Sequence, residues 1–195
     1  MNNRNHHKNR RSIRLRDFDY SSPGEYFVTI CTHQRECLFG DVVGGEMVLN
    51  EIGEIAAKYW YQIPGRYENV VIDAFVVMPN HVHGIIGIEF NPDRDKQPVG
   101  AIHELPLQVG DTDFETFRKQ RRQMLLSKII GWYKMNVSKQ VNILLNNTGN
   151  PFWQRNYYEH IIRNEKSYLR IQNYIINNPS KWGDDLNHPQ NMHKK

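Results

Sequence analysis

The sequence predicts an α+β fold in which an antiparallel β-sheet is covered by helices packed on one face. Short apolar stretches rich in β-branched and aromatic residues alternate with stretches of helical periodicity, as this fold class requires. Two of the apolar stretches are separated only by Pro79 and Asn80, a tight turn that pairs neighbouring strands antiparallel. The length of 195 residues suits a single domain with a core of its own.

The strands are expected where β-branched and aromatic side chains concentrate between turn residues. Two of these stretches are near-continuous apolar runs, and a short pair is joined through glycines. The expected strands are residues 25–32, a short pair around Leu38 and at 47–49, and then 70–78, 83–90 and 152–162.

The helices are expected where apolar residues recur at helical spacing beside capping residues. Asn50 is suited to cap a first helix that ends at Pro64. Periodicity returns at residues 126–137, which predicts a second helix. Asn164 is suited to cap a last helix, which runs until Pro179 because the residue before a proline is disfavoured in the α region.

Three segments stand apart from this periodic body of the expected single domain, residues 1–195. Residues 1–16 form a basic arm, 91–117 a polar insertion rich in proline and glycine, and 183–195 a polar tail. No stretch approaches the roughly 20 consecutive apolar residues that span a bilayer. The basic arm lacks the apolar core of a signal peptide, so we expect a cytoplasmic protein that is not bound to membranes.

The net charge is only +4, but the basic residues are clustered. Six of them precede the first acidic residue, Asp17, and a second cluster lies at residues 118–122. Such clusters suit a phosphate backbone, although solvated charges on a tail and a helix face would explain them equally well. The residues that could contact a nucleic-acid backbone are Arg14, Arg16, Arg118, Lys119, Arg121, Arg122 and Lys134.

His81 and His83 flank Val82 at the start of an expected strand. Side chains two residues apart in a strand point to the same face, so both imidazoles can reach one metal ion while Val82 faces the core. The alternative is that two histidines at a strand end bond only to nearby loops. The spacing alone leaves both interpretations open.

Tyr174 and Asn178 lie four residues apart near the end of the last expected helix. Residues at this spacing lie on one helix face, so an amide oxygen of Asn178 and the hydroxyl of Tyr174 can be adjacent. A tyrosine near a helix end is also commonly a half-buried core residue with its hydroxyl in water. The pair indicates a functional site only when it is considered together with the two histidines.

Taken together, the motifs resemble those of the IS200-like, REP-associated tyrosine transposases of the HUH superfamily, named for a His-hydrophobic-His pair. The resemblance covers most of residues 14–182, but many family members have Val-Lys where this chain has Ser180 and Lys181. The motifs are Pro-Gly-Glu-Tyr-Phe-Val-Thr at 23–29, Val-Val-Met-Pro-Asn-His-Val-His-Gly at 76–84, Trp-Gln-Arg-Asn-Tyr-Tyr-Glu-His-Ile-Ile-Arg at 153–163 and Asn-Tyr-Ile-Ile-Asn-Asn-Pro at 173–179.

The resemblance implies a ferredoxin-like or RRM-like HUH fold and a DNA-nicking and rejoining enzyme. Tyr174 would be the nucleophile, forming a 5′-phosphotyrosine, and Asn178 would join His81 and His83 around a divalent metal, Mg²⁺ or Mn²⁺. The implied partner is single-stranded DNA containing a hairpin, bound by a monomer or a homodimer. His160 could assist the tyrosine or be structural.

Three alternatives remain at this point. Tyr157, Tyr158 and Tyr168 are rival nucleophiles, but none has a carbonyl ligand four residues later beside a helix end. A catalytically silent nucleic-acid-binding module would need neither the histidines nor Tyr174. A metal-dependent hydrolase using an activated water would explain the histidines and leave Tyr174 without a role.

Overall fold

The computed structural model of the chain describes residues 19–91, 124–146 and 149–191. The basic arm, nearly all of the expected insertion and the cluster at 118–122 lie outside the described residues. In chain order the elements are β1 Gly24–Cys31, η1 His33–Arg35, β2 Gly40–Val43, β3 Glu46–Leu49, α1 Glu51–Tyr61, α2 Ile63–Arg66, β4 Val70–Met78, β5 His81–Ile88, α4 Leu125–Leu144, β6 Tyr158–Ile162, α5 Glu165–Ile176, η2 Pro179–Asp184 and η3 Pro189–Asn191.

The main sheet is antiparallel, with strand order β4-β5-β1-β6. β2 and β3 pair with each other in a separate hairpin. β4 and β5 are joined through Pro79 and Asn80 and pair up to Met78 and His81, as the sequence predicted. The α+β class with an antiparallel sheet is therefore confirmed.

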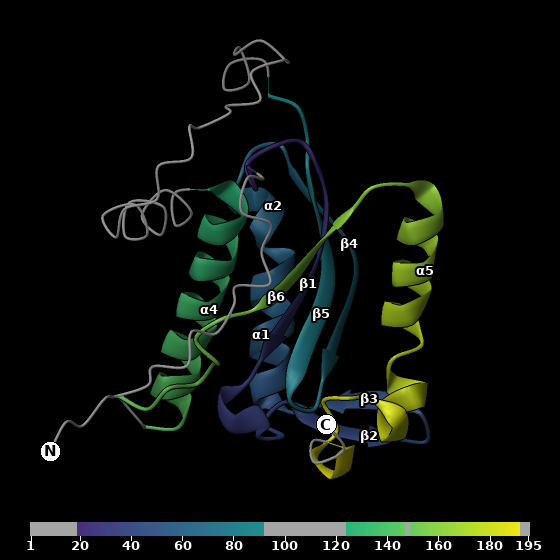
Figure 1. Cartoon of the computed structure of the whole chain (residues 1–195). Helices are drawn as coiled ribbons and strands as arrows, with labels where there is room; N and C mark the ends of the chain where they lie inside the picture. Colours follow the sequence, from purple (N-terminus) through teal and green to yellow (C-terminus); the bar gives the residue numbers. More distant parts are fainter. Residues whose placement is uncertain (1–18, 92–123, 147–148, 192–195) are drawn as a thin grey trace, which may run out of the picture.

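The helices cover both faces of the sheet, which differs from the expected covering of one face. Figure 1 shows α1 and α4 on one side of the sheet and α5 on the other. The reason lies in the central strands, whose side chains are apolar on both faces. In β1, Val28 belongs to the cluster under α1 and α4, whereas Phe27 packs with Ile171 and Ile175 of α5.

Local signals place the ends of the helices. Oδ1 of Asn50 accepts a hydrogen bond from the backbone of Gly53 at 3.0 Å, and Asn164 caps α5 in the same way through Ser167 at 2.9 Å. Both predicted N-caps are thus confirmed. α1 ends before Pro64, which instead lies in the first turn of α2, where a missing N–H costs nothing.

The last strand is shorter than expected. β6 begins only at Tyr158, and Trp153 makes an isolated bridge with Thr32. Phe152 and Trp153 turn inward against Phe39, with ring centroids 5.8 and 5.5 Å from it. Burying these rings in the core takes the chain out of the sheet before β6 begins.

Trp60 of α1 fixes the distance between its helix and the sheet. Its ring stacks on Phe75 at 4.6 Å and meets Tyr133 of α4 edge-on at 5.4 Å. Gly84 of β5 lies beneath it, and a Cβ there would be 2.2 Å from Cζ2 of Trp60. The close approach therefore needs a glycine at the position that follows His83.

α4 packs an apolar stripe against the same face of the sheet and against α1. The buried side chains of this stripe are Leu126, Ile129, Ile130, Tyr133, Val137 and Val141. No helix in the described part of the chain combines the length and the apolar character needed to cross a membrane.

Candidate active site

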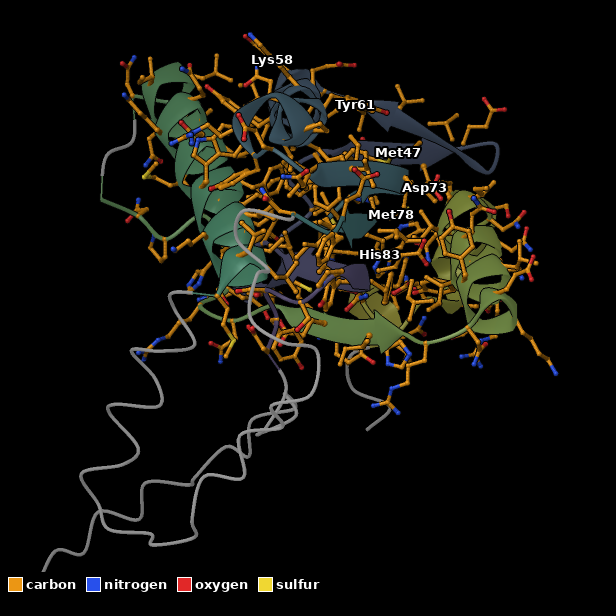
Figure 2. The ribbon with its side chains drawn as sticks, turned by 90° about the horizontal axis from the view of Figure 1, so that it is seen from above. Met47, Lys58, Tyr61, Asp73, Met78 and His83 are labelled. Atoms are coloured by element: carbon orange, nitrogen blue, oxygen red, sulfur yellow. The ribbon has the colours of Figure 1, made fainter. Side chains whose placement is uncertain are left out.

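His81 and His83 lie on one face of the sheet at the start of β5. Cross-strand pairing sets His83 between Val76 of β4 and Thr29 of β1. Their Nε2 atoms are 2.9 Å apart, and their side chains are 0% and 2% exposed. Val82 points into the opposite core, as predicted. Figure 2 shows Met78 and His83 in the sheet, well away from Lys58 and Tyr61 on α1.

Asn80 determines which nitrogen of His81 is free. Its Nδ2 donates to the backbone oxygens of Arg35 at 3.0 Å and Asn187 at 2.8 Å, so its Oδ1 is left to accept from Nδ1 of His81 at 2.8 Å. Burial and then the nearby Arg35 lower the pKa of His81 to about 3, so the ring is neutral at pH 7. A neutral ring with its proton on Nδ1 presents a lone pair at Nε2.

His83 is held in a similar way. Its Nδ1 lies 2.8 Å from Oγ1 of Thr29, and its ring stacks on Phe27 at 5.3 Å. Burial, followed by the neighbouring His81, holds the pKa of His83 well below its ordinary value, while Asp185 acts in the opposite direction. Two neutral imidazoles therefore converge through their Nε2 atoms on one point.

Tyr174 of α5 reaches the same point from the other side. Its hydroxyl lies 3.1 Å from Nε2 of His83 and 3.4 Å from Oδ2 of Asp185. The side chain is 44% exposed, so a substrate can reach it. Partial burial of the side chain and then the Asp185 carboxylate raise the pKa of Tyr174 to about 12, while a hydrogen bond from Asn178 acts to lower it. The phenol is therefore protonated at neutral pH.

Asn178 lies just beyond the end of α5 and is 2% exposed. Its Nδ2 donates to Oδ2 of Asp185 at 3.0 Å, which directs its Oδ1 elsewhere. That buried oxygen has no hydrogen-bond partner within the described residues. An unpaired buried carbonyl costs free energy unless something else binds it, as a cation would.

Asp185 is the site residue that sequence reasoning missed. It is 8% exposed, and its Oδ1 accepts from the backbone of Asn187 at 2.6 Å. Ligand atoms of His81, His83 and Asp185 lie within 4.8 Å of one another. Asp185 belongs to the segment expected to be a polar tail, and its only signal in the sequence is the aromatic Trp182 nearby, which suggests packing.

Residues 179–191 fold back over the histidines rather than trailing from the domain. The ring of Trp182 lies 6.0 Å from that of His81 and 4.7 Å from that of His188. Asn191 donates from Nδ2 to the backbone of Gly183 at 2.8 Å, which closes the segment on itself. Residues 183–191 of the expected polar tail therefore help to cover the site.

The donor set fits a divalent cation. Two imidazole lone pairs and an amide oxygen without a hydrogen-bond partner among the described residues are available as ligands, and the Asp185 carboxylate lies beside the imidazoles. Oxygen ligands suit Mg²⁺ and Mn²⁺, and imidazole ligands favour transition metals over Mg²⁺. The two Nε2 lone pairs face each other and repel unless a proton lies between them. A cation bound to both lone pairs would remove this repulsion.

The other predicted residues lie elsewhere or outside the described structure. His160 is exposed on β6, on the same sheet face as the site and opposite Phe27, and no hydrogen bond joins it to the site among the described residues. Nζ of Lys134 donates to the backbone oxygens of Gln154 at 2.6 Å and Arg155 at 3.2 Å, so it braces the approach to β6. The remaining basic candidates lie outside the described residues: Arg14, Arg16, Arg118, Lys119, Arg121 and Arg122.

Comparison with known proteins identifies a relative but no named activity. No family model matches the sequence. A protein of Haemophilus influenzae strain Rd, described as uncharacterized, is 42% identical over 180 residues and covers 92% of each chain. This identity over nearly the full length shows common descent and a shared fold.

Two solved structures show a weaker likeness. One is a REP-associated tyrosine transposase bound to a REP hairpin, with 21% identity, a TM-score of 0.45, and coverage of 83% of this chain and 69% of that one. The other is a Deinococcus radiodurans protein assigned provisionally as a transposase, with 17% identity, a TM-score of 0.36, and coverage of 80% and 91%. Both TM-scores lie below 0.5, so function has to be inferred from the site itself.

Proposed function

We propose that this chain, which belongs to the same family as the Haemophilus influenzae protein, is a metal-dependent endonuclease and strand transferase for hairpin-containing single-stranded DNA. We further propose that it is a cytoplasmic transposase of the single-tyrosine HUH class, which its motifs resemble, with Tyr174 as nucleophile. One observation carries the proposal. The Tyr174 hydroxyl is 3.1 Å from Nε2 of His83, which is 2.9 Å from Nε2 of His81.

The reaction is a transfer of a phosphodiester from one oxygen to another. The phenol oxygen of Tyr174 forms a bond to the scissile phosphorus, and the bond from phosphorus to the 3′-oxygen breaks. The products are a 5′-phosphotyrosine and a 3′-hydroxyl, which takes up a proton. The bond energy is retained, so a 3′-hydroxyl can later attack the linkage and rejoin a strand without ATP.

Asp185 is the group best placed to receive the proton of Tyr174. A hydroxyl has one proton, and its two acceptors here are Nε2 of His83 and Oδ2 of Asp185. If a cation occupied the lone pair of His83, only the carboxylate would remain to accept that proton. A phenol with a pKa of about 12 needs such an acceptor to attack at neutral pH.

The residues that would hold the ion are His81, His83 and Asn178. Both oxygens of Asp185 already accept hydrogen bonds, whereas Oδ1 of Asn178 accepts none within the described residues. A bound divalent ion would supply a positive charge for the phosphate oxygens. Asn80 and Thr29 keep the imidazoles in place by bonding to their Nδ1 atoms.

The two competing functions explain less of this geometry. A silent binding module gives no reason for a buried histidine pair beside an orphan amide oxygen. A hydrolase using water gives no reason for a half-exposed tyrosine whose hydroxyl bonds to one of those histidines. A tyrosine nucleophile accounts for both observations.

The proposal is tested by trapping the intermediate. The full chain is incubated with Mn²⁺ and a fluorescent single strand that contains a hairpin with unpaired flanks. We expect a protein–DNA adduct on a denaturing gel, with the DNA mapped to Tyr174 by mass spectrometry. Free DNA fragments without any adduct would support the hydrolase instead, and binding without cleavage would support the silent module.

A further inference from the structure

A groove runs beside the candidate active site, along β6 and the first turns of α5. Its volume is about 790 Å³. It lies next to the outer edge of the sheet, because among the described strands β6 pairs with β1 alone. The polar and aromatic residues that line it include Tyr158, His160, Arg163, Asn164, Lys166 and Arg170.

The charge of this groove is positive. Arg163, Lys166 and Arg170 are all exposed, and none of them has a hydrogen bond or ion pair within the described part of the chain. One carboxylate, Glu159, also belongs to the wall, but it is only 7% exposed. Neighbouring residues of a strand point to opposite faces, so Glu159 points away from the face that carries Tyr158. A polyanion suits this surface better than a neutral or basic ligand.

The cations lead along α5 to the nucleophile. Lys166, Arg170 and Tyr174 follow one another at four-residue spacing, one helical turn and about 6 Å apart at each step. Ile171 and Ile175 hold α5 to the sheet, which leaves the neighbouring stripe of three side chains open to solvent. A chain of phosphates laid on this stripe would pass the Tyr174 hydroxyl.

Tyr158 links the groove to the site from the strand side. Its ring is 41% exposed and meets Phe27 edge-on at 6.2 Å. Phe27 in turn meets Tyr174 at 6.1 Å and His83 at 5.3 Å. An exposed aromatic ring next to a cationic track is the combination on which unpaired bases stack.

We propose that this groove binds the unpaired strand adjoining the scissile phosphate. Lys166, Arg170 and Arg163 hold its phosphates, and Tyr158 stacks on one of its bases. The inference rests on the proposed function, since Tyr174 defines where the scissile phosphate lies. It assigns the loose strand, rather than a hairpin stem, to this groove.

The test compares two variants that each remove two positive charges. Lys166→Gln/Arg170→Gln alters the groove, and Lys58→Gln/Lys139→Gln alters exposed positions on α1 and α4, on the other side of the sheet. Both are made with Tyr174→Phe, so that only reversible binding is measured. The probe is a fluorescent unstructured single strand, titrated by anisotropy across a salt series.

The logarithm of the binding constant falls linearly with the logarithm of the salt concentration, and each phosphate contact on a single strand contributes about 0.7 to that slope. Because the groove variant loses two contacts, we expect its slope to be less steep by about 1.4. Its affinity near 0.1 M salt falls by roughly 25-fold relative to the parent. Tyr158→Ala lowers affinity by at least about fivefold without changing the slope. The control variant changes neither. Equal losses in the two charge variants, or no loss in either, would overturn the inference.

Adduct formation separates this inference from the proposed function. If the chain with Tyr174 intact forms the adduct but the groove variant binds single strands normally, the groove assignment fails and the nuclease stands. If no adduct forms, but the groove variant still binds single strands more weakly and with a less steep salt dependence, the proposed nuclease function is wrong and the strand-binding role of the groove is supported.

Discussion

The hydroxyl of Tyr174 lies 3.1 Å from Nε2 of His83, although 91 residues separate the two along the chain. One residue comes from the helix on one face of the sheet, and the other from a central strand. Their contact brings a phenol to the point where two neutral imidazoles converge.

Replacing the proposed nucleophile should separate chemistry from binding. Tyr174→Phe is expected to abolish the covalent adduct and to change DNA affinity by less than about threefold, because only the hydroxyl is lost. Adduct yield on a denaturing gel and binding by anisotropy measure the two effects. Tyr61→Phe, at an exposed position of α1, is the matched control and should form adduct normally. An adduct in Tyr174→Phe mapped to Tyr157, Tyr158 or Tyr168 would contradict the assignment.

Replacing a histidine should remove stabilisation by metal. Mn²⁺ at 100 times its dissociation constant should stabilise the native protein by about 2.7 kcal/mol, and this gain should disappear in His81→Gln and His83→Gln. Urea unfolding with and without Mn²⁺ measures it, which also reports any loss of stability that is independent of metal. His33→Gln, outside the site, should retain the gain. A full gain in either site variant would show that the pair is not a ligand set.

Asp185 should act on the tyrosine more than on the metal. Asp185→Asn is expected to slow adduct formation by at least about 100-fold, the usual contribution of a general base. Its loss of Mn²⁺ affinity, measured by calorimetry, should be much smaller than that of His81→Gln. Asp184→Asn, an exposed neighbour, is the matched control and should behave as the parent. Equal losses of Mn²⁺ affinity in Asp185→Asn and His81→Gln would make Asp185 a ligand instead.

Two glycine substitutions should have opposite effects on stability. In Gly84→Ala the new Cβ would meet Cζ2 of Trp60 at 2.2 Å, so the free energy of unfolding should fall by about 1–3 kcal/mol or more. In Gly131→Ala nothing lies within 4 Å of the new Cβ, and α4 should gain about 0.5–1 kcal/mol. Urea denaturation of both variants is the measurement. A stable Gly84→Ala protein would show that β5 and α1 can move apart.

Much of the fold was predictable because its signals act over a few residues. The caps at Asn50 and Asn164 bond to residues only three positions later, and the turn at Pro79 and Asn80 joins adjacent strands. Alternation along a strand likewise requires His81 and His83 to share a face. None of these features depends on how distant parts of the chain meet, so the sequence alone is enough to determine them.

The completed site was decided only by tertiary structure. The near-continuous apolar runs at residues 70–78 and 83–90 indicate strands that are buried on both faces. They do not show that α5 covers the face opposite α1 and α4, because that depends on how elements far apart in the chain pack. Asp185 enters the site because residues 179–191 fold back over His81, and no local periodicity encodes such a return. The role proposed for its carboxylate depends on the hydroxyl of Tyr174, which lies 3.4 Å away. Chemistry that depends on distances between separate elements exists only once those elements have packed.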